Sequence, residues 1–246
     1  MRQRVVVVEG FLDRAFVKGF IERRGCVSLG ASGQPAPKDP WGAQVKGGQY
    51  AFKTASGAFL RLVPAQGDAA LLKTVRVFIN DAPTRPVDVL LMIRDPDVDV
   101  GVDWRGPLAG RLDNLFGAEP TLVRHPTLAN AFAGPGLSIG SLACWVADDV
   151  SPLLPGKQTL ERLVVAAVDE AHPDWSAHVA QFLAGRPSPP ASSGKEAAMA
   201  LMAGWFSSRL SEGFFEAVWS DDRIAEALER RLAASDTLVA LERLVS

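Results

Sequence analysis

The sequence predicts an α/β protein with a mostly parallel central sheet flanked by helices, followed by a small C-terminal helical extension. Three apolar runs indicate buried strands, because a parallel sheet is covered on both faces and its strands then lack a polar side. Stretches with helical periodicity separate these runs, as in repeated β-α units. The three runs are Val5–Val8, Val87–Ile93 and Ser138–Val146.

The first β-α unit is the most regular part of the sequence. The β-branched run Val5–Val8 stops at Glu9 and Gly10. Large apolar side chains then recur at helical spacing up to residue 24, and Gly25 ends the predicted helix. The sequence therefore predicts a strand, a short turn that holds Glu9 and Gly10, and a helix.

The middle of the chain mixes regular elements with a predicted insertion. Residues 28–50 are rich in Gly, Pro, Ala and Ser, which is typical of a loop. We expect the whole stretch 28–65 to be an insertion between the first and second strands. The other elements expected before the C-terminal region are helices at 71–79, 108–116 and 159–171 and a short strand at 119–123.

The sequence divides into an α/β domain at 1–185, a Pro/Ser-rich linker at 186–194 and a helical extension at 195–246. Two or three helices are expected in the extension. Its Trp and Phe residues between 205 and 219 are grouped at helical spacing, which favours a packed core over a base-stacking platform.

Composition limits the choice of function. The formal net charge is −2, which does not by itself indicate a nucleic-acid partner. A metal-dependent nuclease can nevertheless be acidic overall, because bound metals and a local basic rim supply the positive field. The sequence has no nucleophile elbow, no P-loop and no dinucleotide fingerprint.

Cellular location follows from the absence of export signals and from the cysteines. Cys26 and Cys144 are far apart in the sequence and form no CxxC pair, so we expect two free cysteines in a reducing compartment. We see no signal peptide and no stretch of about 18 apolar residues. A cytoplasmic protein without membrane segments is expected.

Acidic residues follow each of the three apolar runs. Glu9 follows the first, Asp95 and Asp97 follow the second, and the pair at 148–149 follows the third. In an open α/β sheet the carboxyl ends of parallel strands form the ligand site, so these acids are expected to converge. Clustered carboxylates repel one another, and a bound Mg²⁺ or Mn²⁺ removes that repulsion.

Two segments resemble the sequence motifs of the Toprim family. The segment VVVVEGFLDRAF is similar to the first Toprim motif, and LLMIRDPDVD is similar to the second. The later stretch CWVADDVSPLLPGKQTLERLVVAAV resembles small stand-alone bacterial and archaeal Toprim proteins related to OLD-type nucleases. The resemblance spans roughly residues 4–210 and implies a Toprim-like α/β fold.

The resemblance implies specific roles for individual residues. Glu9 would be a metal ligand or a general acid/base, Asp95 and Asp97 paired metal ligands, and Asp99 an alternative ligand. Asp13 and Glu161 match further acids of these families, and both would help with a second metal site. Lys195 would neutralise developing phosphate charge. The residues expected to act as catalysts are Glu9, Asp13 and Lys195, and Arg94 and Arg105 are expected to contact phosphate along with Lys195.

The favoured function is divalent-metal-dependent phosphodiester hydrolysis of DNA or RNA by a nuclease, with a role in phage defence implied by resemblance. One alternative is a catalytically weak metal-binding protein that partners a separate ATPase; another is a small phosphatase. Nucleic acid is the expected partner, and a homodimer is a further expectation.

Each acidic residue also has a purely structural interpretation. Glu-Gly and Asp-Pro-Asp after a strand are common turns, and the acids at 148–149 fit a turn better than a metal site. Asp13 and Glu161 lie where a helix dipole favours a surface acid. Lys195 fits an ordinary linker charge, and the three histidines are expected to be structural or at the surface.

Overall fold

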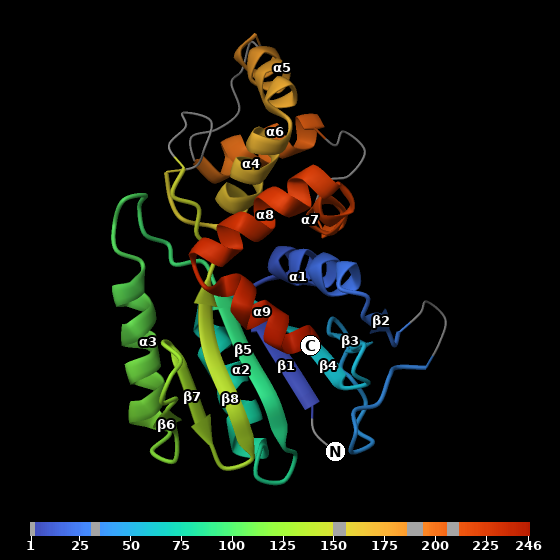
Figure 1. Cartoon of the computed structure of the whole chain (residues 1–246), viewed down its shortest axis with the longest axis vertical. Helices are drawn as coiled ribbons and strands as arrows, with labels where there is room; N and C mark the ends of the chain where they lie inside the picture. Colours follow the sequence, from blue (N-terminus) through green and yellow to red (C-terminus); the bar gives the residue numbers. More distant parts are fainter. Residues whose placement is uncertain (1–2, 31–34, 150–155, 186–193, 206–211) are drawn as a thin grey trace.

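A mixed eight-stranded sheet, in the order β2-β3-β4-β1-β5-β8-β7-β6, forms the centre of the protein (Figure 1). The computed structural model describes residues 3–30, 35–149, 156–185, 194–205 and 212–246. The strands are β1 (Gln3–Val8), β2 (Val27–Ser28), β3 (Tyr50–Lys53), β4 (Phe59–Pro64), β5 (Val87–Arg94), β6 (Val123–Arg124), β7 (Ala131–Gly134) and β8 (Leu137–Cys144).

The α/β class is confirmed, but a mostly parallel sheet is not. Only the four central strands β4, β1, β5 and β8 run parallel to one another. The strands outside them pair antiparallel. Short turns join β3 to β4 and β7 to β8, and such turns can connect only antiparallel neighbours. Gly57 and Gly136 lie in two of these hairpin turns with positive φ, a conformation that glycine adopts without strain.

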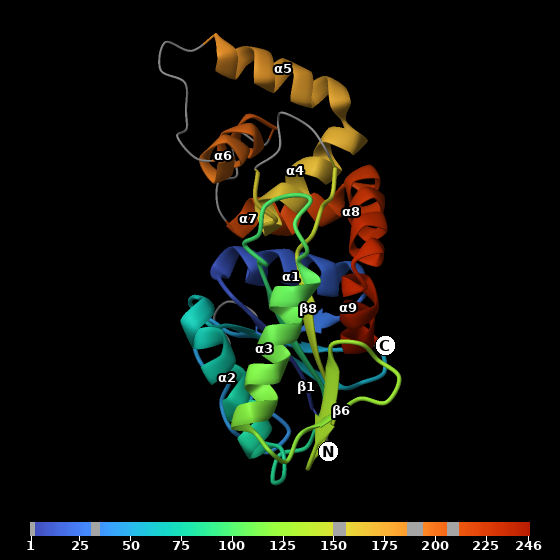
Figure 2. The same ribbon diagram turned by 90° about the vertical axis from the view of Figure 1, so that its left-hand side faces the viewer.

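Helices cover both faces of the sheet. Figure 2 shows α2 (Asp68–Asp81) and α3 (Arg105–Ala118) on one face, with α1 (Phe11–Arg23) and α9 (Thr237–Val245) on the other. Strand β1 is buried between these layers, and its side chains alternate between two cores. Val5 and Val7 belong to the core under α2 and α3, whereas Val6 and Val8 belong to the core under α1 and α9. This burial explains the unbroken apolar run.

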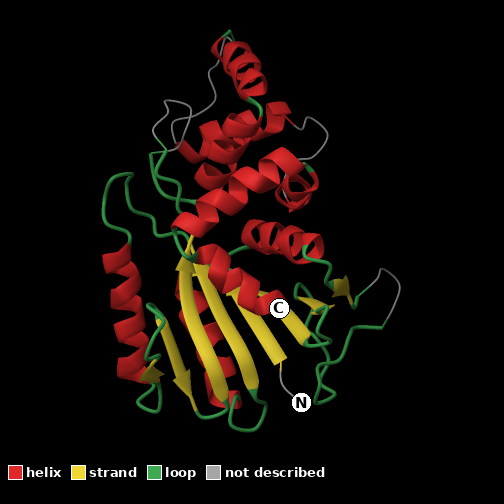
Figure 3. Cartoon of the chain, in the orientation of Figure 1, coloured by secondary structure: helices red, strands yellow, loops and turns green. Residues whose placement is uncertain are grey.

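A layer of helices lies beyond the carboxyl ends of the central strands, whose arrowheads point toward it in Figure 3. These helices are α4 (Leu160–Ala171), α5 (Pro173–Ala184), α6 (Gly194–Trp205), α7 (Glu212–Ala217) and α8 (Asp222–Ala234), with a 3-10 turn at Val218–Ser220. Helix α4 packs against α8, although the sequence places them in different predicted domains. The C-terminal helices also share the core of β1.

The structure differs from the sequence-based expectation within 28–65. Strands β3 and β4 lie inside the predicted insertion, and β4 pairs directly with β1 at the centre of the sheet. The predicted linker lies almost wholly outside the described residues, which resume at Gly194. Among the described helices, none is both long and apolar enough to cross a membrane.

Candidate metal centre

The turn from β1 into α1 positions the first two acids. Glu9 directly follows β1, and Asp13 lies in the first turn of α1. The Asp13 Oδ2 atom accepts a hydrogen bond of 3.0 Å from the Gly10 backbone N–H, so this carboxylate caps the start of its own helix. Asp13 is almost fully buried, which is unusual for a capping acid.

The start of α4 brings in two more acids from distant parts of the sequence. Asp95 directly follows β5, and its Oδ1 atom accepts a 2.8 Å hydrogen bond from the Leu160 backbone N–H. Glu161 lies in the first turn of α4 and is almost completely buried. The N-terminal ends of α1 and α4 therefore both approach the same place, and their partial positive charges favour anions there.

These four acids surround one small cavity. Its volume is about 220 Å³. Glu9, Asp13, Asp95 and Glu161 all line it, together with Gly10, Leu12, Gln66, Gly67 and Leu160. The cavity lies at the carboxyl ends of β1 and β5, where an open α/β sheet is expected to bind its ligand.

Burial and mutual repulsion raise the pKa values of Asp13 and Asp95. Burial raises the pKa of Asp13 to about 6, with a further contribution from Glu9, while a hydrogen bond from Trp145 opposes the rise. Burial, followed by repulsion from Asp13 and Glu161, raises the pKa of Asp95 well above its ordinary value. Each acid is therefore costly to ionise in the absence of a counter-charge.

The pKa of Glu9 is also raised, but nearby charges act on it in both directions. Burial raises its pKa, and the Arg94 guanidinium is the largest opposing influence. The Glu9 Oε2 atom is buried and has no hydrogen-bond partner among the described residues. A buried carboxylate oxygen without a partner is energetically unfavourable unless a cation or proton reaches it.

Asp97 and Asp99 do not line the cavity of the four acids, although Asp97 lies near enough to Glu9 to raise its pKa. Asp97 is largely exposed, has positive φ, and pairs with Arg94 at 3.2 Å. Arg94 is buried and also pairs with Asp68 at 3.3 Å. Asp99 is exposed, and its backbone forms a bridge with Lys157. Their roles as metal ligands stay predictions.

Asp148, Asp149 and Arg105 are not among the residues that line the cavity. Asp149 pairs with Arg231 at 2.6 Å and Asp148 accepts a hydrogen bond from Gln158, which fits the structural interpretation of this pair. Arg105 lines a separate cavity of about 350 Å³ and stacks on Trp104. Lys195 is the second residue of α6, and its side chain is outside the described part of the structure.

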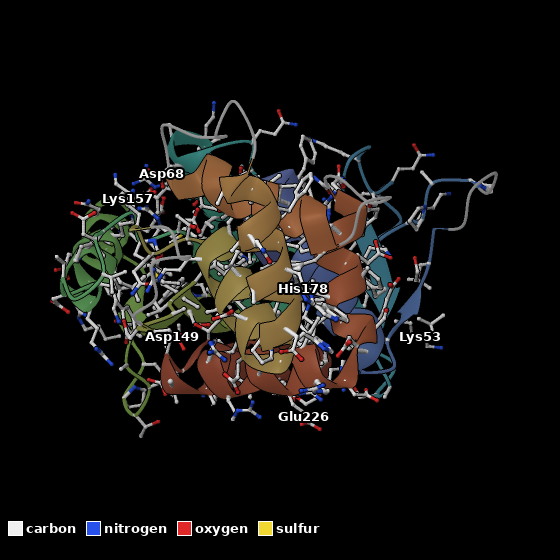
Figure 4. All side chains as sticks on the ribbon, turned by 90° about the horizontal axis from the view of Figure 1, so that it is seen from above. Lys53, Asp68, Asp149, Lys157, His178 and Glu226 are labelled. Carbon is white, nitrogen blue, oxygen red and sulfur yellow. The ribbon has the colours of Figure 1, made fainter. Side chains whose placement is uncertain are left out.

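The histidines also lie away from the four acids. Figure 4 shows His178 on α5, at the outermost part of the helical layer. His172 bonds to Asp221 at 2.9 Å, between α4 and α8.

Sequence analysis did not identify Trp145 as part of this site. Trp145 directly follows β8 and is fully buried. Its indole Nε1–H donates a 2.6 Å hydrogen bond to the Oδ1 atom of Asp13. Nothing in the sequence distinguishes it from an ordinary core tryptophan, because the contact joins residues that are far apart along the chain.

The donor atoms suit a hard divalent cation. All four acidic side chains supply carboxylate oxygens, which Mg²⁺ and Mn²⁺ prefer. Within the described ranges, however, no group of three or more His, Cys, Asp or Glu side chains already has a metal-binding arrangement. Holding an ion therefore requires some of these side chains to turn toward one another.

Comparison with known proteins supports the fold alone. No protein-family model matches the chain, and no curated protein matches it either. A crystal structure of the hypothetical protein PH0156 from Pyrococcus horikoshii OT3 is similar over the full length of both chains, with a TM-score of 0.64. The two sequences are 17% identical, so the likeness concerns architecture and not activity.

Proposed function

We propose that this protein is a divalent-metal-dependent phosphodiester hydrolase that acts on DNA or RNA. The supporting observation is the convergence of Glu9, Asp13, Asp95 and Glu161 on one cavity at the carboxyl ends of two parallel strands. Three of these acids have raised pKa values, so the cavity favours a compensating positive charge.

The residues have separable roles in this proposal. Glu9 and Asp95 would hold the first Mg²⁺ or Mn²⁺, and Asp13 and Glu161 would complete the oxygen shell or help to hold a second ion. When bound, the ion supplies charge stabilisation and acidifies a coordinated water. Glu9 is the best candidate to accept the proton of the attacking water, since one of its oxygens is free of hydrogen bonds from described residues.

A buried arginine supplies positive charge near the cavity. Arg94 lies next to Glu9 and is engaged by Asp68 and Asp97. A phosphate diester would therefore depend strongly on the metal for binding. Strict metal dependence is expected, and Arg94 contributes mainly by balancing the charge of the acids around it.

A cleavage assay on defined nucleic acids tests the proposal. Purified protein is stripped with EDTA and then given Mg²⁺ or Mn²⁺ with supercoiled plasmid, single-stranded DNA or single-stranded RNA. Glu9→Gln and Asp95→Asn remove charge and preserve shape, and the asparagine can still accept the Leu160 N–H bond. We expect each to lower the cleavage rate at least about 100-fold.

Glu226→Gln is the matched control. Glu226 is an exposed acid on α8, labelled in Figure 4 on the outer surface of the helical layer. Its replacement should leave the rate unchanged. Cleavage that persists in EDTA, or that survives both Glu9→Gln and Asp95→Asn, contradicts the proposal. Hydrolysis of an aryl phosphate with all nucleic acids left intact indicates the phosphatase alternative.

The expected cytoplasmic location, homodimer, partner ATPase and phage-defence role stay predictions.

A further inference from the structure

Two buried tryptophans with similar surroundings have different hydrogen-bond acceptors. Trp145 and Trp219 both contact the ring of Phe16, with ring centroids 5.2 Å and 5.0 Å away. Trp219 donates its indole N–H to the Phe16 backbone carbonyl at 2.9 Å. Trp145 donates instead to the carboxylate of Asp13. Both side chains are almost completely buried.

The acceptor of Trp145 is uncommon for a core tryptophan. A buried indole N–H needs an acceptor, and a backbone carbonyl satisfies it without placing charge in the core. Asp13 is a carboxylate that lines the cavity beside Glu9, Asp95 and Glu161. The Trp145 bond therefore joins the apolar core directly to the acidic cavity.

Asp13 is held at both of its oxygens. Oδ1 accepts from the Trp145 indole at 2.6 Å, and Oδ2 accepts from the Gly10 backbone N–H at 3.0 Å. An ionised carboxylate has about four lone-pair positions, so two remain for a cation or a water. The two donors come from different strand ends and together restrict rotation of the side chain.

We propose that Trp145 is a positioning residue for divalent-cation binding: its indole N–H fixes the Asp13 carboxylate in the orientation that the cation requires. This proposal rests on the proposed metal-dependent function. Trp145 contacts neither cation nor substrate and acts only through Asp13. Replacing a residue that orients a metal ligand in this way typically lowers metal affinity or activity by about 10- to 100-fold.

Replacement of each tryptophan by phenylalanine tests the proposal with a matched pair. Trp145→Phe and Trp219→Phe each remove an indole N–H and a similar buried volume beside Phe16. Mn²⁺ alone is titrated into the full-length protein by calorimetry, and the thermal midpoint of each variant is measured without metal. We expect Trp145→Phe to weaken Mn²⁺ binding about 10-fold or more, and Trp219→Phe to change it less than about 2-fold.

A second measurement on the wild-type protein avoids dependence on folding of the variants. Indole ¹H–¹⁵N resonances are assigned by triple-resonance spectroscopy and followed during Mg²⁺ addition. The Trp145 resonance should shift as the ion binds, whereas the Trp219 resonance should stay in place. An unmoved Trp145 resonance during saturable Mg²⁺ binding overturns the proposal, as does equal Mn²⁺ affinity of the two variants.

The outcomes separate this inference from the proposed function. Selective weakening of Mn²⁺ binding by Trp145→Phe, in a protein that cuts no nucleic acid, supports the positioning role and contradicts the nuclease. Metal-dependent cutting with normal Mn²⁺ affinity in Trp145→Phe contradicts only the positioning role. A wild-type protein that binds no Mn²⁺ contradicts both.

Discussion

The buried carboxyl group of Asp13 makes the stability of the folded protein depend on pH. Its folded-state pKa of about 6 is above the ordinary value of 3.8, so between these values the folded chain holds a proton that the unfolded chain has released. The stabilising contribution is fully present below about pH 4 and is lost as the pH rises through 6. Asp95 and Glu9 shift in the same direction.

We therefore expect the metal-free protein to lose stability between pH 5 and pH 7.5. Asp13 alone should lower the free energy of unfolding by about 1 kcal/mol over this range. Urea unfolding in EDTA at both pH values measures the change, and Asp13→Asn should make the dependence weaker. A wild-type protein that gains stability over this range, with no difference in Asp13→Asn, contradicts the expectation. Saturating Mn²⁺ should oppose the loss, because metal binding favours ionised carboxylates.

The acids could be predicted at the residue scale, but their hydrogen bonds could not. Glu9 and Asp95 follow the two most apolar runs, so a sequence pattern locates them at strand ends. The pairing of Asp97 with Arg94 depends on where the chain turns after β5. The bond from Trp145 depends on β8 pairing with β5, and neither motif contains that information.

Among the elements, α4 is the one on which the cavity most depends. Its first turn carries Glu161, and its first backbone N–H groups are capped from two sides. The Thr159 side chain accepts from the Arg162 N–H, and Asp95 accepts from the Leu160 N–H. Fraying of the first turn of α4 would displace Glu161 and break the hydrogen bond that holds Asp95.

Thr159→Ala should lower the free energy of unfolding by about 1 kcal/mol, the usual effect of losing an N-cap side chain. It should also weaken Mn²⁺ binding, because α4 supplies part of the cavity wall. Asp221→Ala is the control for a lost cap elsewhere, since Asp221 caps α8 by accepting from the Ile224 N–H. It also removes the bond to His172 at the far end of α4, so the comparison tests whether the first turn of α4 in particular supports the cavity. Chemical unfolding and Mn²⁺ titration measure both effects. Equal Mn²⁺ affinity in the two variants contradicts the special role of α4.

The sequence predicts the elements that have a strong apolar pattern. It does not predict the elements whose place depends on pairing with other strands. Strands β1 and β5 each contain a long apolar run, because both of their faces are buried. Strand β4 has a mixed burial pattern and follows a Gly-rich stretch, so its place beside β1 is decided by pairing. The two-residue Pro135-Gly136 turn makes β7 antiparallel to β8, a local feature that sequence analysis missed.

At the scale of the whole molecule, the C-terminal helices belong to the main core. Leu228 of α8 and Leu241 of α9 share one apolar cluster with Val6 and Phe16. Arg24 of the first unit pairs with Glu229 at 3.2 Å and with Glu242 at 2.6 Å. The boundary predicted at residue 185 therefore does not coincide with a division of the core.

A fragment that ends at residue 185 should not fold cooperatively. It retains the sheet but exposes the apolar surface that α8 and α9 cover, and exposed apolar surface of this kind binds hydrophobic dyes. Near-ultraviolet circular dichroism, dye binding and urea unfolding compare the fragment with the full chain. A sharp urea transition without dye binding would falsify the shared-core interpretation and restore 1–185 as an independent domain.

The wide sequence separation of the four acids has a consequence for biosynthesis. Glu9 leaves the ribosome early, whereas Glu161 and the helices that seal the core emerge much later. A nascent chain therefore cannot gather the four carboxylates before Glu161 has been synthesised. Under the proposed function, the nascent chain itself has no hydrolase activity until these later segments have folded.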